Sequence, residues 1–166
     1  MASAADSPLC FADAPMVARD VARGVGRLFF RRDQFAICEM PLPNGRRADM
    51  VAICAAGLIT IVEIKVSRAD LMGDGKWPDY LDYCDYFFWA VPAGFPLEPL
   101  ECDEKGQHCS GLIVADRYDA EVIREAPLRK LAPARRKSET LRFARRAARR
   151  LAGEIDPGLN AFQLFP

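Results

Sequence analysis

Residues 46–66 read RRADMVAICAAGLITIVEIKV, and this stretch decides the fold. Its second half, 58–66, is almost continuously apolar and rich in β-branched residues, which is typical of a central strand buried on both faces. Its first half, 47–54, predicts a neighbouring strand, and a turn at Ala56-Gly57 joins the two. A glutamate and a lysine inside such a buried strand indicate that this hairpin carries a function.

The flanking segments extend the hairpin into a larger sheet. Upstream, apolar residues spaced three and four apart predict a helix that begins at Pro15 and ends near residue 30. A short strand at 35–40 follows and turns at Asn44-Gly45, a strong hairpin signal. Downstream, the pattern predicts a partly helical stretch, further strands and a long helix: 68–83, 86–91, 111–115, 121–125 and 133–151. This order predicts an α/β fold with a mixed sheet and a C-terminal helix.

Length and composition narrow the class of protein. The 166 residues favour a single domain, 15–166, behind a flexible N-terminal tail, 1–14. We expect a cytoplasmic protein without membrane contact, because neither a secretory signal nor an apolar run of spanning length is present. The formal net charge is zero, yet residues 129–150 hold ten Lys or Arg and one acid. A basic arm on an acidic body favours an anionic partner for the arm.

Three charged residues in the hairpin predict a metal site. Glu63 and Lys65 alternate with Ile64 and therefore point to the same face of their strand, and Asp49 can lie across from them on the neighbouring strand. Two carboxylates suit Mg²⁺ or Mn²⁺, hard cations that polarise a phosphate and lower the pKa of a bound water, while a lysine offsets charge on the phosphorus. The simpler alternative is an ion pair between neighbouring strands. Glu39, at the end of the preceding strand, is a further candidate as a metal ligand or a carboxylate behind the ligands, or else an exposed acid.

Two groups of residues are candidates for contact with nucleic acid. Arg68, Lys76 and Tyr80 follow the metal strand, where they could meet a phosphate, a base or a sugar; alternatively, Tyr80 covers the sheet. The last helix presents arginines at spacings that suit a phosphate backbone: Arg142, Arg145, Arg146, Arg149 and Arg150. We expect an apolar stripe to dock this helix on the sheet: Leu141, Ala144, Ala148 and Leu151. The alternative is that the arginines form a solvated face.

Several strings occur in an order that resembles one known family. The strings GRRADMVAI, IVEIKVSRADL, KWPDYLDYCDYFFWAVP, GLIVADRYDAEVIREAP and KLAPARRK are similar to the MmcB-like family, whose members are inferred to be DNA-repair endonucleases. The resemblance implies the PD-(D/E)xK superfamily, with a restriction-endonuclease-like αβββαβ core, Mg²⁺ or Mn²⁺ as cofactor and DNA as substrate. It assigns Asp49 and Glu63 as metal ligands, the backbone carbonyl of Ile64 as a further ligand, and Lys65 as the catalytic lysine. Ala48 replaces the proline of the motif.

The resemblance also sets expectations for partners. Many such nucleases pair to cut two strands, so a homodimer is one expectation, and other repair proteins are another. Two alternatives stay open. The domain could bind nucleic acid as a catalytically silent adaptor of a repair complex, or its arginine helix could meet an acidic protein.

Overall fold

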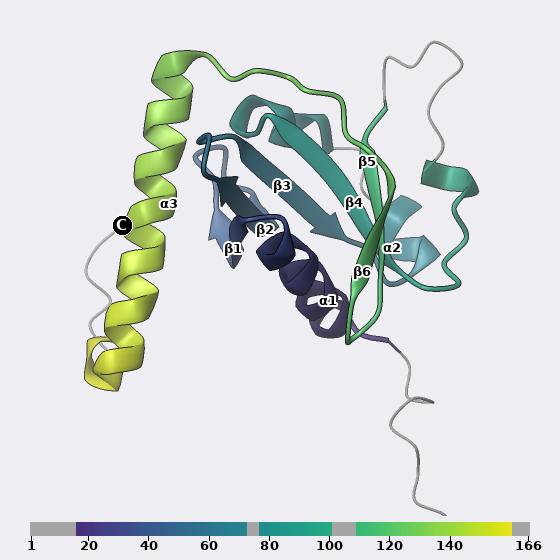
Figure 1. Ribbon diagram of the computed structural model, residues 1–166, viewed down its shortest axis with the longest axis horizontal. Helices are drawn as coiled ribbons and strands as arrows, with labels where there is room; N and C mark the ends of the chain where they lie inside the picture. Colours follow the sequence, from purple (N-terminus) through teal and green to yellow (C-terminus); the bar gives the residue numbers. More distant parts are fainter. Residues whose placement is uncertain (1–15, 73–76, 101–108, 161–166) are drawn as a thin grey trace, which may run out of the picture.

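The computed structural model describes residues 16–72, 77–100 and 109–160, and it folds around one six-stranded sheet (Figure 1). The predicted tail and Lys76 lie outside the described residues. The strands are β1 (Gln34–Pro41), β2 (Arg47–Cys54), β3 (Ile59–Ile64), β4 (Tyr86–Pro92), β5 (Gly111–Ala115) and β6 (Ala120–Arg124). The helices are α1 (Ala18–Arg31), α2 (Arg68–Met72) and α3 (Pro133–Ile155), with short 3₁₀ turns η2 (Trp77–Tyr83), η3 (Glu98–Leu100) and η4 (Pro157–Asn160).

The strands lie side by side in chain order, and the sheet is mixed. β1, β2 and β3 pair antiparallel, β3, β4 and β5 pair parallel, and β6 returns antiparallel to β5. Apart from the short 3₁₀ turn η2, the chain from α1 to β4 runs α1-β1-β2-β3-α2-β4 and follows the expected αβββαβ order. The predicted mixed α/β sheet with a C-terminal helix is therefore confirmed. Every residue of β3 is buried, as its continuous apolar run predicts.

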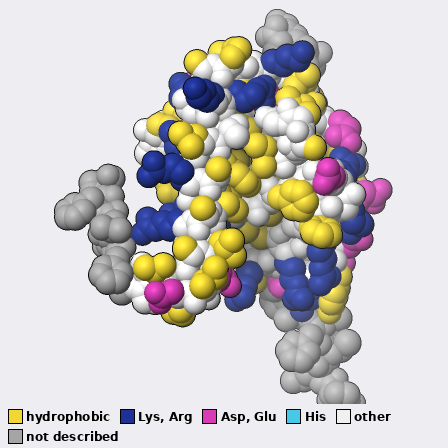
Figure 2. Space-filling model, turned by 60° about the vertical axis from the view of Figure 1, so that its left-hand side comes forward, with side chains coloured by type: hydrophobic (Ala, Val, Ile, Leu, Met, Phe, Trp, Pro, Cys, Tyr) yellow, Lys and Arg dark blue, Asp and Glu magenta, His cyan; other side chains and the backbone are white. Residues whose placement is uncertain are grey.

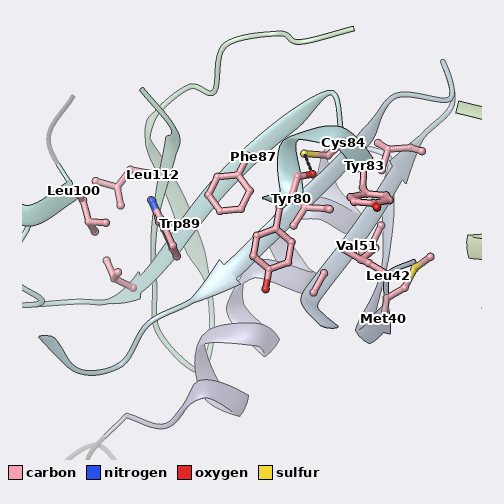
Figure 3. Packing of buried hydrophobic residues seen from close by; sticks show 14 of the residues in the cluster. Met40, Leu42, Val51, Tyr80, Tyr83, Cys84, Phe87, Trp89, Leu100 and Leu112 are labelled. Carbon is pink, nitrogen blue, oxygen red and sulfur yellow. Dashed lines mark hydrogen bonds between the residues drawn. The ribbon is translucent and has the colours of Figure 1, made fainter. Parts of the chain in front are cut away.

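Each face of the sheet has its own hydrophobic layer. On one face α1 packs its buried side, including Val25 and Phe29, against residues such as Val62. On the other face the η2 turn lays its aromatic rings over β4 (Figure 3). The Tyr80 ring stacks on Phe87 with the centroids 5.9 Å apart, and Trp77 stacks on Phe87 at 5.2 Å. Glu63 of β3 lies on this second face, opposite α1, beside Trp89 of β4.

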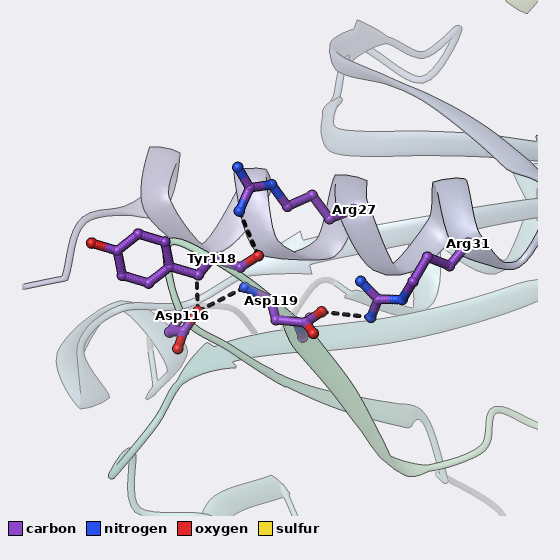
Figure 4. Close-up of polar contacts among 6 residues, drawn as sticks. Arg27, Arg31, Asp116, Tyr118 and Asp119 are labelled. Carbon is purple, nitrogen blue, oxygen red and sulfur yellow. Dashed lines mark hydrogen bonds and ion pairs between the residues drawn. The ribbon is translucent and has the colours of Figure 1, made fainter.

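The α1 helix begins later than the sequence predicts, at Ala18 rather than Pro15. The Asp20 carboxylate accepts a hydrogen bond from the Val17 N–H at 3.3 Å, so it caps the helix and sets its start. Gly24 marks a close approach: a Cβ there would lie 2.2 Å from the carbonyl oxygen of Asp116 in the β5–β6 turn. Arg27 and Arg31 of α1 hold the same turn through the Tyr118 carbonyl and the Asp119 carboxylate (Figure 4).

The orientation of α3 contradicts the sequence prediction. The residues expected to dock it face solvent: Leu141 and Leu151 are 57% and 63% exposed, and Ala144 and Ala148 are exposed as well. Figure 2 shows hydrophobic side chains lying open along this helix. The helix instead contacts the body through Arg136, Phe143 and Arg150, which are seven residues apart and so share one face.

A buried ion pair explains this orientation. The Asp85 carboxylate, 1% exposed, accepts hydrogen bonds from the Ile59 and Leu131 N–H groups and from both terminal nitrogens of Arg136, at 2.6–3.0 Å. Arg136 also donates to the Gly57 carbonyl at 2.7 Å. Because Asp85 would be costly to bury unpaired, this pair fixes the rotation of α3 and carries its apolar stripe outward. Within the described residues, no helix has the length and apolarity to cross a membrane.

Candidate active site

Asp49 and Glu63 converge where β2 and β3 separate. The β2–β3 pairing stops at Met50 and Val62, and one further step would place Asp49 opposite Glu63. At that point, hydrogen bonds from backbone N–H groups to side-chain carboxylates take the place of the hydrogen bonds between the two strands. Glu63 Oε1 accepts a hydrogen bond from the Asp49 N–H at 3.1 Å, and Asp49 Oδ2 accepts one from the Ile64 N–H at 2.8 Å. These reciprocal bonds hold both carboxylates at the fork between the strands.

Lys65 lies on the same face as Glu63 and is almost as buried, with 7% and 4% exposed respectively. Its Nζ is 3.7 Å from the Asp70 carboxylate in α2 and 5.6 Å from the centre of the Trp89 ring. Its positive charge also acts on Asp49, whose ionised form it favours. The structure therefore brings together the three residues that the sequence predicts as a catalytic set.

The electrostatics of Asp49 favour a cation at this fork. Burial raises the pKa of its carboxyl above the usual value, and the Ile64 N–H and the Lys65 charge oppose this only in part. A bound divalent ion would offset that penalty. The donors also fit Mg²⁺, which typically takes one or two carboxylates and keeps several waters. The Ile64 carbonyl belongs to the residue between Glu63 and Lys65 and is the remaining predicted ligand.

Glu39 lies beside the fork but does not complete a three-carboxylate cluster. Its neighbours Cys38 and Met40 pair with Met50 and Ala48, so Glu39 stands across from Asp49 on the edge strand. Its φ is +55°, a left-handed conformation that costs a non-glycine residue energy. Its carboxylate is paired with Arg47 Nε at 2.5 Å. In the described part of the chain, no three His, Cys, Asp or Glu side chains gather closely enough to hold one metal ion.

The predicted nucleic-acid contacts near α2 differ in accessibility. Arg68 is exposed at the start of α2 and can meet a phosphate. Tyr80 is 5% exposed, and its hydroxyl donates to the Arg47 carbonyl at 3.4 Å. Its ring is stacked on Phe87 and buried, so it is not available to a base. For Tyr80 the alternative interpretation, that it covers the sheet, is the correct one.

Four of the five predicted arginines of α3 line one groove of about 650 Å³ between α3 and the end of β1. Its lining comprises Met40, Pro41, Leu42, Pro43, Ser138, Leu141, Arg142, Arg145, Arg146 and Arg149. Arg145 and Arg149 are exposed, while Arg142 and Arg146 are turned partly inward. The groove thus combines a basic wall from the helix with a largely apolar wall from the strand.

Arg150 has a structural role that the sequence analysis did not assign. Its guanidinium donates to the backbone carbonyl of Cys38 and, at 3.4 Å, to that of Glu39. These carbonyls belong to the free edge of the sheet, so Arg150 covers part of that edge and ties α3 to the strand beside the fork. The seven-residue spacing from Arg136 through Phe143 to Arg150 is the signal that could have identified it.

Comparisons with known proteins agree with this architecture. A solved structure described as a protein of unknown function from Silicibacter pomeroyi is similar to this chain, with a TM-score of 0.80 and 41% sequence identity. The match covers 92% of this chain and 98% of that one. No curated protein matches the chain at a significant level. The family model described as DNA repair protein MmcB-like matches residues 5–158, so this chain belongs to the MmcB-like family of DNA repair proteins.

Proposed function

We propose that this protein is a metal-dependent DNA endonuclease that acts in repair. The observation that supports it most is the meeting of the Asp49 and Glu63 carboxylates at the β2–β3 fork, with Lys65 buried on the same face. Membership of a DNA repair family favours DNA over other phosphodiesters. A cytoplasmic location, which the sequence predicts, is part of this proposal.

Each residue of the fork has a defined role in this proposal. The Asp49 and Glu63 carboxylates and the Ile64 carbonyl would hold Mg²⁺ or Mn²⁺. When bound, such an ion polarises the phosphate and lowers the pKa of a coordinated water. The Lys65 ammonium would donate to a non-bridging phosphate oxygen and offset the negative charge that develops there, in a site from which water is largely excluded.

Hydrolysis then has a simple balance. The water oxygen forms a bond to phosphorus and releases a proton to solvent, the bond from phosphorus to the leaving sugar oxygen breaks, and the leaving oxygen takes up a proton from solvent. Asp70 and Trp89 contribute by holding the Lys65 amine in place, through the 3.7 Å ion pair and the contact with the ring face. They act through Lys65, and we assign them no contact with the reacting atoms.

A cleavage assay tests the proposal. Purified protein is incubated with supercoiled plasmid and with branched and single-stranded oligonucleotides, in Mg²⁺, Mn²⁺ or EDTA. Lys65→Ala runs beside Lys130→Ala, a matched control at an exposed lysine far along the chain from the fork. We expect metal-dependent cutting by the wild type and the control, and a loss of about 10²–10³-fold in Lys65→Ala.

Two outcomes would count against the proposal. Equal cutting by Lys65→Ala and the wild type, with both variants folded by thermal melting, would remove Lys65 from the mechanism. DNA binding without cutting by any of the proteins would favour the adaptor alternative instead.

A further inference from the structure

The groove beside α3 contains more positive charge than its surroundings neutralise. Within α3, Glu139 is paired with Arg135 and Arg142. The Nε of Arg146 is buried and has no hydrogen-bond partner in the described structure. Burial, and then the charges of Arg150 and Arg149, lower the pKa of the Arg146 guanidinium. A bound anion would reduce the repulsion between these arginines.

The rest of the groove lining is largely apolar and partly open. Pro41 and Pro43 are exposed at the end of β1 and in the turn after it, and Leu141 of α3 is 57% exposed. Met40 and Leu42 are buried beneath them. A phosphate ion or a duplex backbone would use only the arginine wall. A ligand that fills the whole groove must carry negative charge for the arginines and apolar faces for the rest of the lining.

One end of the groove lies next to the fork along β1. Pro41 and Met40 lie next to Glu39, which stands across from Asp49 in the β1–β2 register. Arg150 connects α3 to the same point through the Cys38 and Glu39 carbonyls. A chain lying in the groove would therefore approach the two carboxylates from the edge of the sheet.

We propose that this groove binds single-stranded DNA, with phosphates on the arginine wall and unstacked bases on Pro41, Pro43 and Leu141. Bases of a single strand expose their faces, whereas those of a duplex are stacked on each other, so only the single strand can use the apolar wall. The inference deepens the proposed function and rests on it for the path to Asp49. Binding itself is measurable without cleavage.

The test is fluorescence anisotropy in EDTA, with a labelled single strand, the duplex of the same sequence and the corresponding RNA strand, over a salt series. Arg145→Ala/Arg149→Ala removes two exposed groove arginines, and Pro43→Ser/Leu141→Ser removes apolar faces from both sides. Arg19→Ala/Arg23→Ala is the matched control, since these exposed arginines lie on α1, across the sheet. Thermal melting verifies that each variant folds.

We expect the wild type to bind the single DNA strand at least tenfold more tightly than the duplex. The arginine variant should weaken both and reduce the salt slope for the single strand by about 1.4, for two lost phosphate contacts. The serine variant should weaken the single strand alone, by about fivefold, because apolar contact with the bases is lost. The control should bind like the wild type.

Several results would overturn the inference: equal affinity for single strand and duplex, an unchanged single-strand affinity in the serine variant, an equal loss in the control, or tighter binding of the RNA strand. The two proposals fail separately. If cutting depends on Lys65 but the groove variants bind DNA like the wild type, only the groove proposal is refuted. Groove-dependent single-strand binding with no Lys65-dependent cutting would remove only the nuclease.

Discussion

Asp85 and Asp49 are both aspartates in the sheet layer, and their surroundings shift the pKa values of the two carboxyls in opposite directions. Burial alone would raise the pKa of Asp85, but the hydrogen bonds from Arg136, Ile59 and Leu131 outweigh it and lower that pKa. At Asp49 burial is the larger effect, and the pKa is raised. Asp85 is thus already paired and supports the fold, whereas the Ile64 N–H and the Lys65 charge offset the burial of Asp49 only in part. The difference separates the anchor of α3 from the proposed active site.

The largest expected effect is on stability, at the anchor. Asp85→Ala removes the carboxylate partner of Arg136 and the acceptor of two backbone N–H groups, so we expect a loss of about 3–5 kcal/mol in the free energy of unfolding. Chemical denaturation measures it. Asp82→Ala, an exposed aspartate in the same turn, is the matched control and should change little.

The pH dependence of this effect has a definite sign. The pKa of Asp85 is lower in the folded state than its ordinary value of 3.8. Asp85 therefore contributes its full stabilisation at pH values above 3.8, and this stabilisation is lost as the pH falls through the folded-state pKa. The difference in the free energy of unfolding between the wild type and Asp85→Ala should therefore narrow only in strong acid. A gap that already narrows between pH 7 and 5 would contradict the pairing.

A smaller and opposite effect is expected at the fork. Because the pKa of Asp49 is raised, its ionised form destabilises the folded protein, and the penalty is complete above the folded-state pKa. In EDTA at pH 7, the Asp49→Asn variant should therefore be more stable than the wild type. The difference should shrink as the pH falls through the folded-state pKa toward the ordinary value of 3.8, below which Asp49 is protonated in both states. Denaturation curves between about pH 4.5 and 7 measure it, and a less stable variant at pH 7 would contradict this account.

The smallest expected effect is local, at the far end of α3. Arg150→Ala removes the donor to the Cys38 and Glu39 carbonyls, so the second half of α3 should open more readily, by about 1 kcal/mol. Hydrogen exchange should report faster exchange there than in the first half, which Arg136 holds. Arg145→Ala is the control, as Arg145 is exposed. Uniform faster exchange along the whole helix would mean that Asp85 and Arg136 do not act as a separate anchor.

The sequence predicts the hairpin well, because its patterns are local. The expected strand 47–54 matches β2, and the expected 58–66 contains β3. Strand alternation alone places Glu63 and Lys65 on one face, and counting across the turn brings Asp49 opposite them. Gly57 ends the turn with a φ of +73°, which suits glycine.

The orientation of α3 could not be predicted from its own pattern. Its apolar stripe suggests docking through Leu141 and Leu151, yet the rotation is fixed by Asp85, 51 residues before Arg136. A contact between residues so far apart in sequence does not affect the spacing of apolar residues within the helix. The one available signal was an aspartate just before the buried strand β4, and it has meaning only once its partner is known. The sequence left two interpretations of Tyr80 open for a similar reason, since its partner Phe87 lies on another element.

The most direct test of the central claim is where a metal ion binds. Crystals soaked in Mn²⁺, with anomalous scattering recorded for the wild type and for Glu63→Gln, would locate it. We expect one peak at the β2–β3 fork in the wild type, about 2.0–2.6 Å from an oxygen of both Asp49 and Glu63, and a weakened or absent peak in the variant. A peak elsewhere, or equal occupancy at the fork in Glu63→Gln, would contradict the assignment of these carboxylates as metal ligands.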